Sequence, residues 1–189
     1  MRVLGIDPDS RGSGWAIVEG DPPRVLKAGI IDTRGNTGIL AVEKQILKIR
    51  EVMPDLPEVD HIIAEYPQSY QDPRKAGRPM HVDPNHLIMI AAISGAVVAA
   101  GALKEGGTIS LVRPAVWKGQ RSKGAVHRYA CRIVKWRYGV TSKPSLPLTE
   151  VIPHEDTEMV MWEGKACKPW SEVLDAVGLA LFELKKQHP

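Results

Sequence analysis

The 189-residue chain has only two cysteines and one phenylalanine. Cys131 and Cys167 form no CxxC motif, and isolated cysteines are more often packing residues than metal ligands. A low cysteine content without a paired pattern is typical of a reducing compartment. We therefore expect both cysteines to be chemically inert.

An apolar strand begins directly after Met1 and Arg2, so we expect no signal peptide. One long uncharged stretch, 87–103, is rich in Ala, Gly and Ser and is short for a membrane span, so it predicts a buried helix. These absences predict a cytoplasmic protein, or one in the host cytoplasm if a phage encodes it, with no membrane partner. The length and a hydrophobic content of 43% predict that residues 1–189 form a single domain.

Acidic residues are absent from 106 to 149, although the net charge of the whole chain is only +3. The basic residues of this segment are Arg113, Lys118, Arg121, Lys123, Arg128, Arg132, Lys135, Arg137 and Lys143. A block of one charge sign indicates a surface for a polyanion, and a solvated basic helix is the alternative. The aromatic residues among these charges are Trp117, Tyr129, Trp136 and Tyr138. Their presence favours nucleic acid as the polyanion.

Hydrophobic patterning predicts an α/β protein. The apolar runs that predict strands are 2–7, 14–19, 25–33, 60–65 and 108–113, the first three forming a meander with a tight turn at Gly12 and Gly14. The segments with helical spacing are 39–53, 86–104, 124–138 and 170–186. The first of these helices is expected to bury Ile39, Val42, Ile46, Ile49 and Met53. The intervening segment 139–168 is long for a loop of a compact domain, which predicts that it is functional or mobile.

Carboxylates stand at the ends of several predicted elements. Asp7 ends the first strand, within LGIDPDSRGSGWAIV, and Glu65 ends the fourth. Glu172 and Asp175 are three residues apart and share one face at the start of the last helix. A turn aspartate and acids favoured by the helix dipole are the alternative explanations. However, a buried carboxylate is costly unless a hydrogen-bond network or a cation offsets its desolvation.

Four converging carboxylates repel one another unless divalent cations neutralise them. Hard oxygen ligands suit Mg²⁺, for which Mn²⁺ is a substitute. Two such ions, about 3.5 to 4 Å apart, would activate a water molecule and stabilise the leaving oxygen of a phosphodiester. An acidic metal site beside a basic surface is therefore typical of a nuclease.

Four segments resemble RuvC-type Holliday junction resolvases, which belong to the RNase H-like superfamily. The residues shared with the family's opening strand and turn are Gly5, Ile6, Asp7, Pro8, Ser10, Gly14 and Trp15. IIAEYP resembles the strand with the family's catalytic glutamate, and EVLDAVGLAL resembles the last helix, with an acid or histidine three residues before the catalytic aspartate. RPAVWKGQRSKGAVHRYACRIV resembles a segment with two lysines. The family has a glycine at the position of Asp9, and the loop after Glu65 and segment 139–168 match it poorly.

This resemblance implies an RNase H-like fold with a central, mixed five-stranded sheet flanked by helices. It implies a Mg²⁺-dependent endonuclease that resolves four-way DNA junctions in recombination and repair. The implied catalytic residues are the metal ligands Asp7, Glu65, Glu172 and Asp175, together with Lys118 and Lys123. An RNA-directed nuclease of the same superfamily and a non-catalytic nucleic-acid-binding module are the alternatives.

The DNA-binding residues are expected in the loop after Glu65 and in the basic segment. They are Tyr66, Tyr70, Arg74, Lys75, Arg78, Lys118, Arg121, Lys123, Arg128 and Arg132. The two tyrosines are expected to stack on opened bases. His127 and His154 are possible metal ligands, but we expect both to be solvated.

A homodimer is expected, because two symmetric cuts in a junction are most directly made by two sites related by a dyad. The helix predicted at 86–104 is apolar nearly all round, so one side can pack on the sheet while another meets a partner. Its small residues, which permit a close approach, are Ala92, Gly95, Ala96 and Ala99. A fully buried helix in a monomer is the alternative.

Overall fold

The structure is a computed structural model and describes residues 1–9, 12–32, 36, 38–66, 84–100, 103–134 and 168–187. Several residues named above lie outside these ranges: Ser10, Tyr70, Arg74, Lys75, Arg78, Lys135, Trp136, Arg137, Tyr138, Lys143, His154 and Cys167. Segment 139–167 lies outside them as well. The predictions made for these residues are therefore not tested by the fold.

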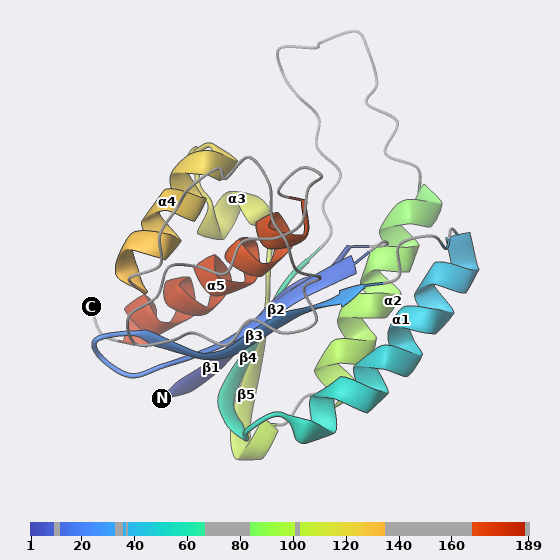
Figure 1. The fold of residues 1–189 in the computed structure, drawn as a ribbon, viewed down its shortest axis with the longest axis horizontal. Coiled ribbons are helices and arrows are strands. Elements are labelled where there is room, and N and C mark those ends of the chain that lie inside the picture. Colours follow the sequence, from blue (N-terminus) through green and yellow to red (C-terminus); the bar gives the residue numbers. More distant parts are fainter. Residues whose placement is uncertain are drawn as a thin grey trace, which may run out of the picture.

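A mixed five-stranded sheet forms the centre of the molecule (Figure 1). Its strands are β1 (Arg2–Asp7), β2 (Gly12–Glu19), β3 (Arg24–Asp32), β4 (Val59–Glu65) and β5 (Leu103–Val112), in the order β3-β2-β1-β4-β5. The first three strands form the predicted antiparallel meander, and β4 and β5 run parallel to β1. The predicted α/β class and the mixed sheet are confirmed.

Helices cover both faces of the sheet, which gives three layers (Figure 1). The helices are α1 (Gly38–Val52), the short 3-10 helix η1 (Met53–Asp55), α2 (Pro84–Ala100), α3 (Pro114–Trp117), α4 (Lys123–Ile133) and α5 (Lys168–Gln187). α1 and α2 lie on one face, and α3, α4 and α5 lie on the other. None of the helices in the described ranges is long and apolar enough to cross a membrane.

The core is divided by the sheet into two clusters, because successive strand side chains point to opposite faces. On β1, Val3 packs toward α5, whereas Leu4 and Ile6 pack toward α1 and α2. The α5 cluster includes Cys131, which is buried as expected for a packing residue. Both faces of β1 are therefore buried, and the strand carries its terminal carboxylate into the interior.

Three predicted element boundaries are wrong. β5 begins at Leu103 rather than 108, because the strand continues through Gly106, which has a positive φ, with a register shift against β4. The preceding helix therefore does not extend to 104. The basic helix ends at Ile133 rather than 138, since Val134 has already left helical geometry.

The buried face of α1 also differs from the prediction. It is centred on Ala41, Val42, Gln45 and Ile49, so Ile39 points away from the core and is 76% exposed. Gln45 is fully buried, and its side-chain oxygen accepts a hydrogen bond from Ser13 Oγ at 2.7 Å. The hydrophobic spacing alone did not reveal this polar contact between α1 and β2.

Gly12 and Gly14 lie in β2 rather than in the predicted turn. Gly14 is needed because α5 crosses β2 there, and a Cβ at this position would collide with the backbone of Glu172. Gly5 on β1 has the same role, since a Cβ there would collide with the carbonyl oxygen of Ala176. These two glycines let α5 lie directly on the strands, which brings its first turns to the end of β1.

Candidate metal and nucleic-acid site

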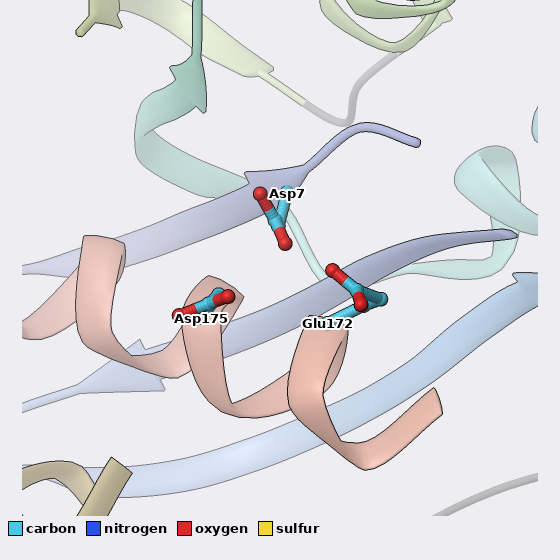
Figure 2. Close-up of side chains that lie close together, drawn as sticks. All are labelled: Asp7, Glu172 and Asp175. Carbon is cyan, nitrogen blue, oxygen red and sulfur yellow. The ribbon is translucent and has the colours of Figure 1, made fainter. Parts of the chain in front are cut away.

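Three carboxylates meet where β1 ends and α5 begins. Figure 2 shows Asp7 on β1 facing Glu172 and Asp175 on α5. One carboxylate oxygen from each residue lies within 4.8 Å of the others. Asp7 is buried and Asp175 has no exposed surface. Oxygens bound to one Mg²⁺ at about 2.1 Å lie at most about 4.2 Å apart, so small side-chain movements would let these three share an ion.

Glu65 lies beside this acidic group rather than within it. It is the last residue of β4, which runs parallel to β1. Both strands therefore present their carboxylates at the same end of the sheet. Its Oε2 accepts a hydrogen bond from the indole nitrogen of Trp117 at 2.8 Å. The structure therefore places all four predicted acids in one region, with Glu65 held by a different set of contacts.

Two lysines contact the acidic residues. The ammonium nitrogen of Lys118, just after α3, lies 3.1 Å from Glu65 Oε2 and 3.6 Å from Asp175 Oδ2. The ammonium nitrogen of Lys123, at the start of α4, lies 2.8 Å from Asp175 Oδ2 and 3.8 Å from Glu172 Oε1. Both lysines therefore stand at the acidic site.

The pKa values of Asp7 and Asp175 are shifted in opposite directions, because the two carboxylates have different neighbours. Burial raises the pKa of Asp7 well above its ordinary 3.8, and a hydrogen bond with Glu172 and the surrounding negative charges raise it further. Burial also acts to raise the pKa of Asp175, but the hydrogen bond from His127 and the charges of Lys118 and Lys123 outweigh burial and hold that pKa below 3.8. Asp7 therefore tends to hold a proton where a cation would otherwise bind.

Both lysines remain charged at neutral pH. Burial lowers the pKa of Lys118, but the carboxylates of Asp175, Glu65 and Asp7 more than offset it, so the pKa is raised above 10.5. The pKa of Lys123 is raised in the same way by Asp175, Glu172 and Asp7. The site thus combines buried acids with fixed positive charges, an arrangement that suits an anionic substrate held next to a cation.

Solved structures share this arrangement of strands and helices. RuvC from Thermus thermophilus in complex with a Holliday junction substrate matches with a TM-score of 0.62 and 16% identity, over 100% of this chain and 95% of that chain. The chain has the RuvC fold. A second structure of Thermus thermophilus RuvC matches with a TM-score of 0.61 and 18% identity, over 100% and 96% of the two chains.

The yeast mitochondrial Holliday junction resolvase Ydc2 has a TM-score of 0.50 and 10% identity, over 99% of this chain and 82% of that chain. No protein-family model and no curated protein sequence matches the chain. The similarity to RuvC is thus one of fold, and it is consistent with the resemblance found in the four short segments of sequence.

Within the RuvC fold, two side chains at the site were interpreted wrongly from the sequence. His127, expected to be solvated, is 6% exposed, and its Nε2 lies 3.1 Å from Asp175 Oδ1, because α4 packs against α5. Trp117, counted among the aromatic residues of a binding surface, is buried and hydrogen-bonded to Glu65. The spacing of Lys123 and His127, four residues apart on one helix, is the signal that indicates a shared face.

Further basic residues lie on α4, the helix that begins at Lys123, and on the loop before it. Arg121, Arg128 and Arg132 are all exposed. The guanidinium groups of Arg121 and Arg132 lie 5.6 Å and 5.7 Å from the ring centre of Tyr129, which supports both by cation–π contact. Tyr66, directly after Glu65, is 47% exposed. The predicted DNA-binding residues in the described ranges thus include two arginines grouped around Tyr129, on and just before the helix that carries Lys123.

Proposed function

We propose that the protein is a Mg²⁺-dependent endonuclease that cuts four-way DNA junctions, acting as a homodimer. The observation that carries this proposal is the buried acidic group of Asp7, Glu172 and Asp175 with two lysine ammonium groups against it. A fold shared with Holliday junction resolvases supports the choice of substrate.

The acidic residues fit a divalent cation. Their carboxylates are hard oxygen ligands of the kind that Mg²⁺ and Mn²⁺ prefer. Asp175 Oδ2 is buried and lies 2.8 Å from the ammonium nitrogen of Lys123 and 3.6 Å from that of Lys118, so positive charge already gathers at this oxygen. In this proposal Asp7, Glu172 and Asp175 hold the metal, Glu65 completes the ligand set, and two ions bind per site.

When bound, Mg²⁺ supplies the charge that activates the attacking water and stabilises the leaving oxygen of the phosphodiester. The residues of the chain position the substrate. Lys118 and Lys123 are close enough to the acids to hold the scissile phosphate and to stabilise the charge that develops on it. The exposed arginines of α4 hold phosphates further along the backbone, and Tyr66 stacks on an opened base.

The homodimer is proposed to form through α2. This helix has no charged residue, and its exposed residues are Pro84, Asn85, Ile88, Ala91, Ala92, Gly95 and Ala99. Ile88 is 66% exposed, while Ile93 and Val97 pack in the core. Thus the sequence interpretation of 87–103 as a buried helix holds for one side only. The free side, with its small residues, suits the close approach of a second α2.

The neighbouring strand β5 extends this apolar surface. Ile109 and Leu111 are exposed, and they pair in register with Ile62 and Ala64 of β4, which pack on the α1 and α2 side of the sheet. Residues paired in register point to the same face, so both exposed side chains lie on the side of the sheet that carries α2. They enlarge the contact available to a second copy.

Cleavage assays with matched substrates test the proposal. A four-way junction, a linear duplex with the same arm sequences and a structured RNA are each incubated with Mg²⁺, Mn²⁺ or EDTA. We expect paired, symmetric cuts in the junction that require the metal and are absent in the Asp7→Asn variant. Preferential cleavage of RNA would favour the other nuclease function, and binding without cleavage in either metal would favour a non-catalytic module.

A further inference from the structure

His127 and Lys123 contact opposite oxygens of Asp175. The two residues are four apart on α4 and lie on the same side of the helix. Lys123 Nζ is 2.8 Å from Oδ2, and His127 Nε2 is 3.1 Å from Oδ1. α4 thus contacts both oxygens of a carboxylate that has no exposed surface.

The chemistry of the two partners determines the direction of the hydrogen bond. An ionised carboxylate accepts hydrogen bonds and cannot donate them. The Nε2–H of His127 is therefore the donor, and Asp175 Oδ1 is the acceptor. A donor on Oδ1 restricts rotation about the Cβ–Cγ bond of Asp175. It therefore keeps Oδ2 on the side of Lys118, Lys123 and Glu172, where the acidic group lies.

We propose that His127 is a positioning residue that orients Asp175, so that Oδ2 faces the divalent cation of the site. This inference rests on the proposed metal-dependent function and names a residue that supports it without touching the cation. Partners that hydrogen-bond to metal ligands typically change metal affinity about 10- to 100-fold when they are removed.

A purely structural role makes a different prediction. If His127 only satisfies a buried acceptor, its loss lowers stability and leaves the metal affinity of the folded protein unchanged. His61 provides a matched control, because it is also a buried histidine, with Nδ1 2.6 Å from Thr108 Oγ1 and Nε2 3.9 Å from Glu183. It lies four residues before Glu65 on β4, about 13 Å away along the strand.

Mn²⁺ binding to the full chain, measured by titration calorimetry without DNA, distinguishes the two roles. His127→Gln retains an N–H donor near the position of Nε2, and we expect it to bind Mn²⁺ within about threefold of the wild type. His127→Asn, whose amide is too short, and His127→Leu should bind about tenfold more weakly or worse. His61→Leu should lower the melting temperature and keep wild-type affinity.

Wild-type affinity in both the Asn and the Leu variants of His127 would overturn the inference and leave the proposed function intact. An equal loss in His61→Leu would also overturn it, since the effect would then follow from a weakened fold. If the Leu variant does not fold, the comparison of Gln with Asn decides. A wild-type protein that binds no Mn²⁺ would refute the proposed metal-dependent function, and this inference with it.

Discussion

Replacing Asp7 by asparagine should stabilise the metal-free protein while it removes the response to Mg²⁺. Asp7 is buried within 4.8 Å of two other carboxylates, so its negative charge is destabilising when no cation is bound. Asparagine has nearly the same shape and no charge. The substitution therefore removes electrostatic repulsion without leaving a cavity, and it removes one expected metal ligand.

The spacing of the acids sets the size of the effect. Two unit charges 4.8 Å apart repel by about 3 kcal/mol at an effective dielectric constant of about 20. The charges of Lys118 and Lys123 and the proton that Asp7 tends to hold relieve part of this repulsion. A net gain of about 1 to 2 kcal/mol remains, which corresponds to a rise in melting temperature of about 2 to 8 °C for a chain of this length.

The pH dependence of stability provides an independent measure. The pKa of Asp7 is raised in the folded state, so the folded protein binds this proton more tightly than the unfolded chain does. The contribution of Asp7 to stability should consequently increase as the pH falls from 7.5 toward 5.5, so acidification should favour the wild type relative to Asp7→Asn. Burial lowers the pKa of His61, which opposes this trend equally in both proteins and cancels in the comparison. Asp175 does not oppose this trend, because its lowered pKa affects stability only as the pH falls below its ordinary 3.8.

Calorimetric melting in EDTA at pH 7.5 and 5.5, and then in Mg²⁺, measures these effects. Wild-type protein should gain stability from Mg²⁺ by mass action, and the variant should gain much less. Asp55→Asn is the control, since it removes one negative charge from an exposed position in η1. The reasoning is refuted if Asp7→Asn melts no higher than wild type in EDTA at pH 7.5 and still responds fully to Mg²⁺.

Three further predictions concern the basic residues Lys118 and Arg132, the packing of α5 and the dimer. Lys118→Ala should lower the cleavage rate on the order of 100-fold with little loss of affinity, because it removes charge stabilisation at the reacting phosphate. Arg132→Ala should instead weaken DNA binding and reduce the slope of log affinity against log salt by about one. Equal losses of affinity in both variants would contradict the assignment of Lys118 to the reaction and Arg132 to DNA binding. Gly14→Ala should lower the melting temperature and weaken Mn²⁺ binding, since a Cβ there displaces α5, and unchanged values would show that α5 tolerates the shift. Ala92→Arg on the exposed side of α2 should convert dimers to monomers in light scattering, while Leu47→Arg on the exposed side of α1 should not. A wild-type monomer of 20.8 kDa that makes paired cuts would disprove the dimer.

The sequence by itself determined the order of the strands and helices. It also determined which strands end in an acidic residue and which helix begins with two. Short apolar runs identified the strands because a buried strand must be apolar on both faces, and this pattern is local. Asp7 and Glu65 were recognisable because each interrupts such a run with an ionisable group. The start of α5 was recognisable from a face that carries two acids three residues apart.

Only the tertiary structure decided which side chains hold those acids. His127 contacts a residue 48 positions away, and Trp117 contacts one 52 positions away. Such contacts depend on how α3 and α4 pack against α5 and β4, and no local pattern of hydrophobicity or charge encodes that packing angle. The role of Gly14 was missed for the same reason. A glycine that permits a turn and one that permits the close approach of a helix are identical in sequence, and only the packing of α5 on β2 distinguishes them.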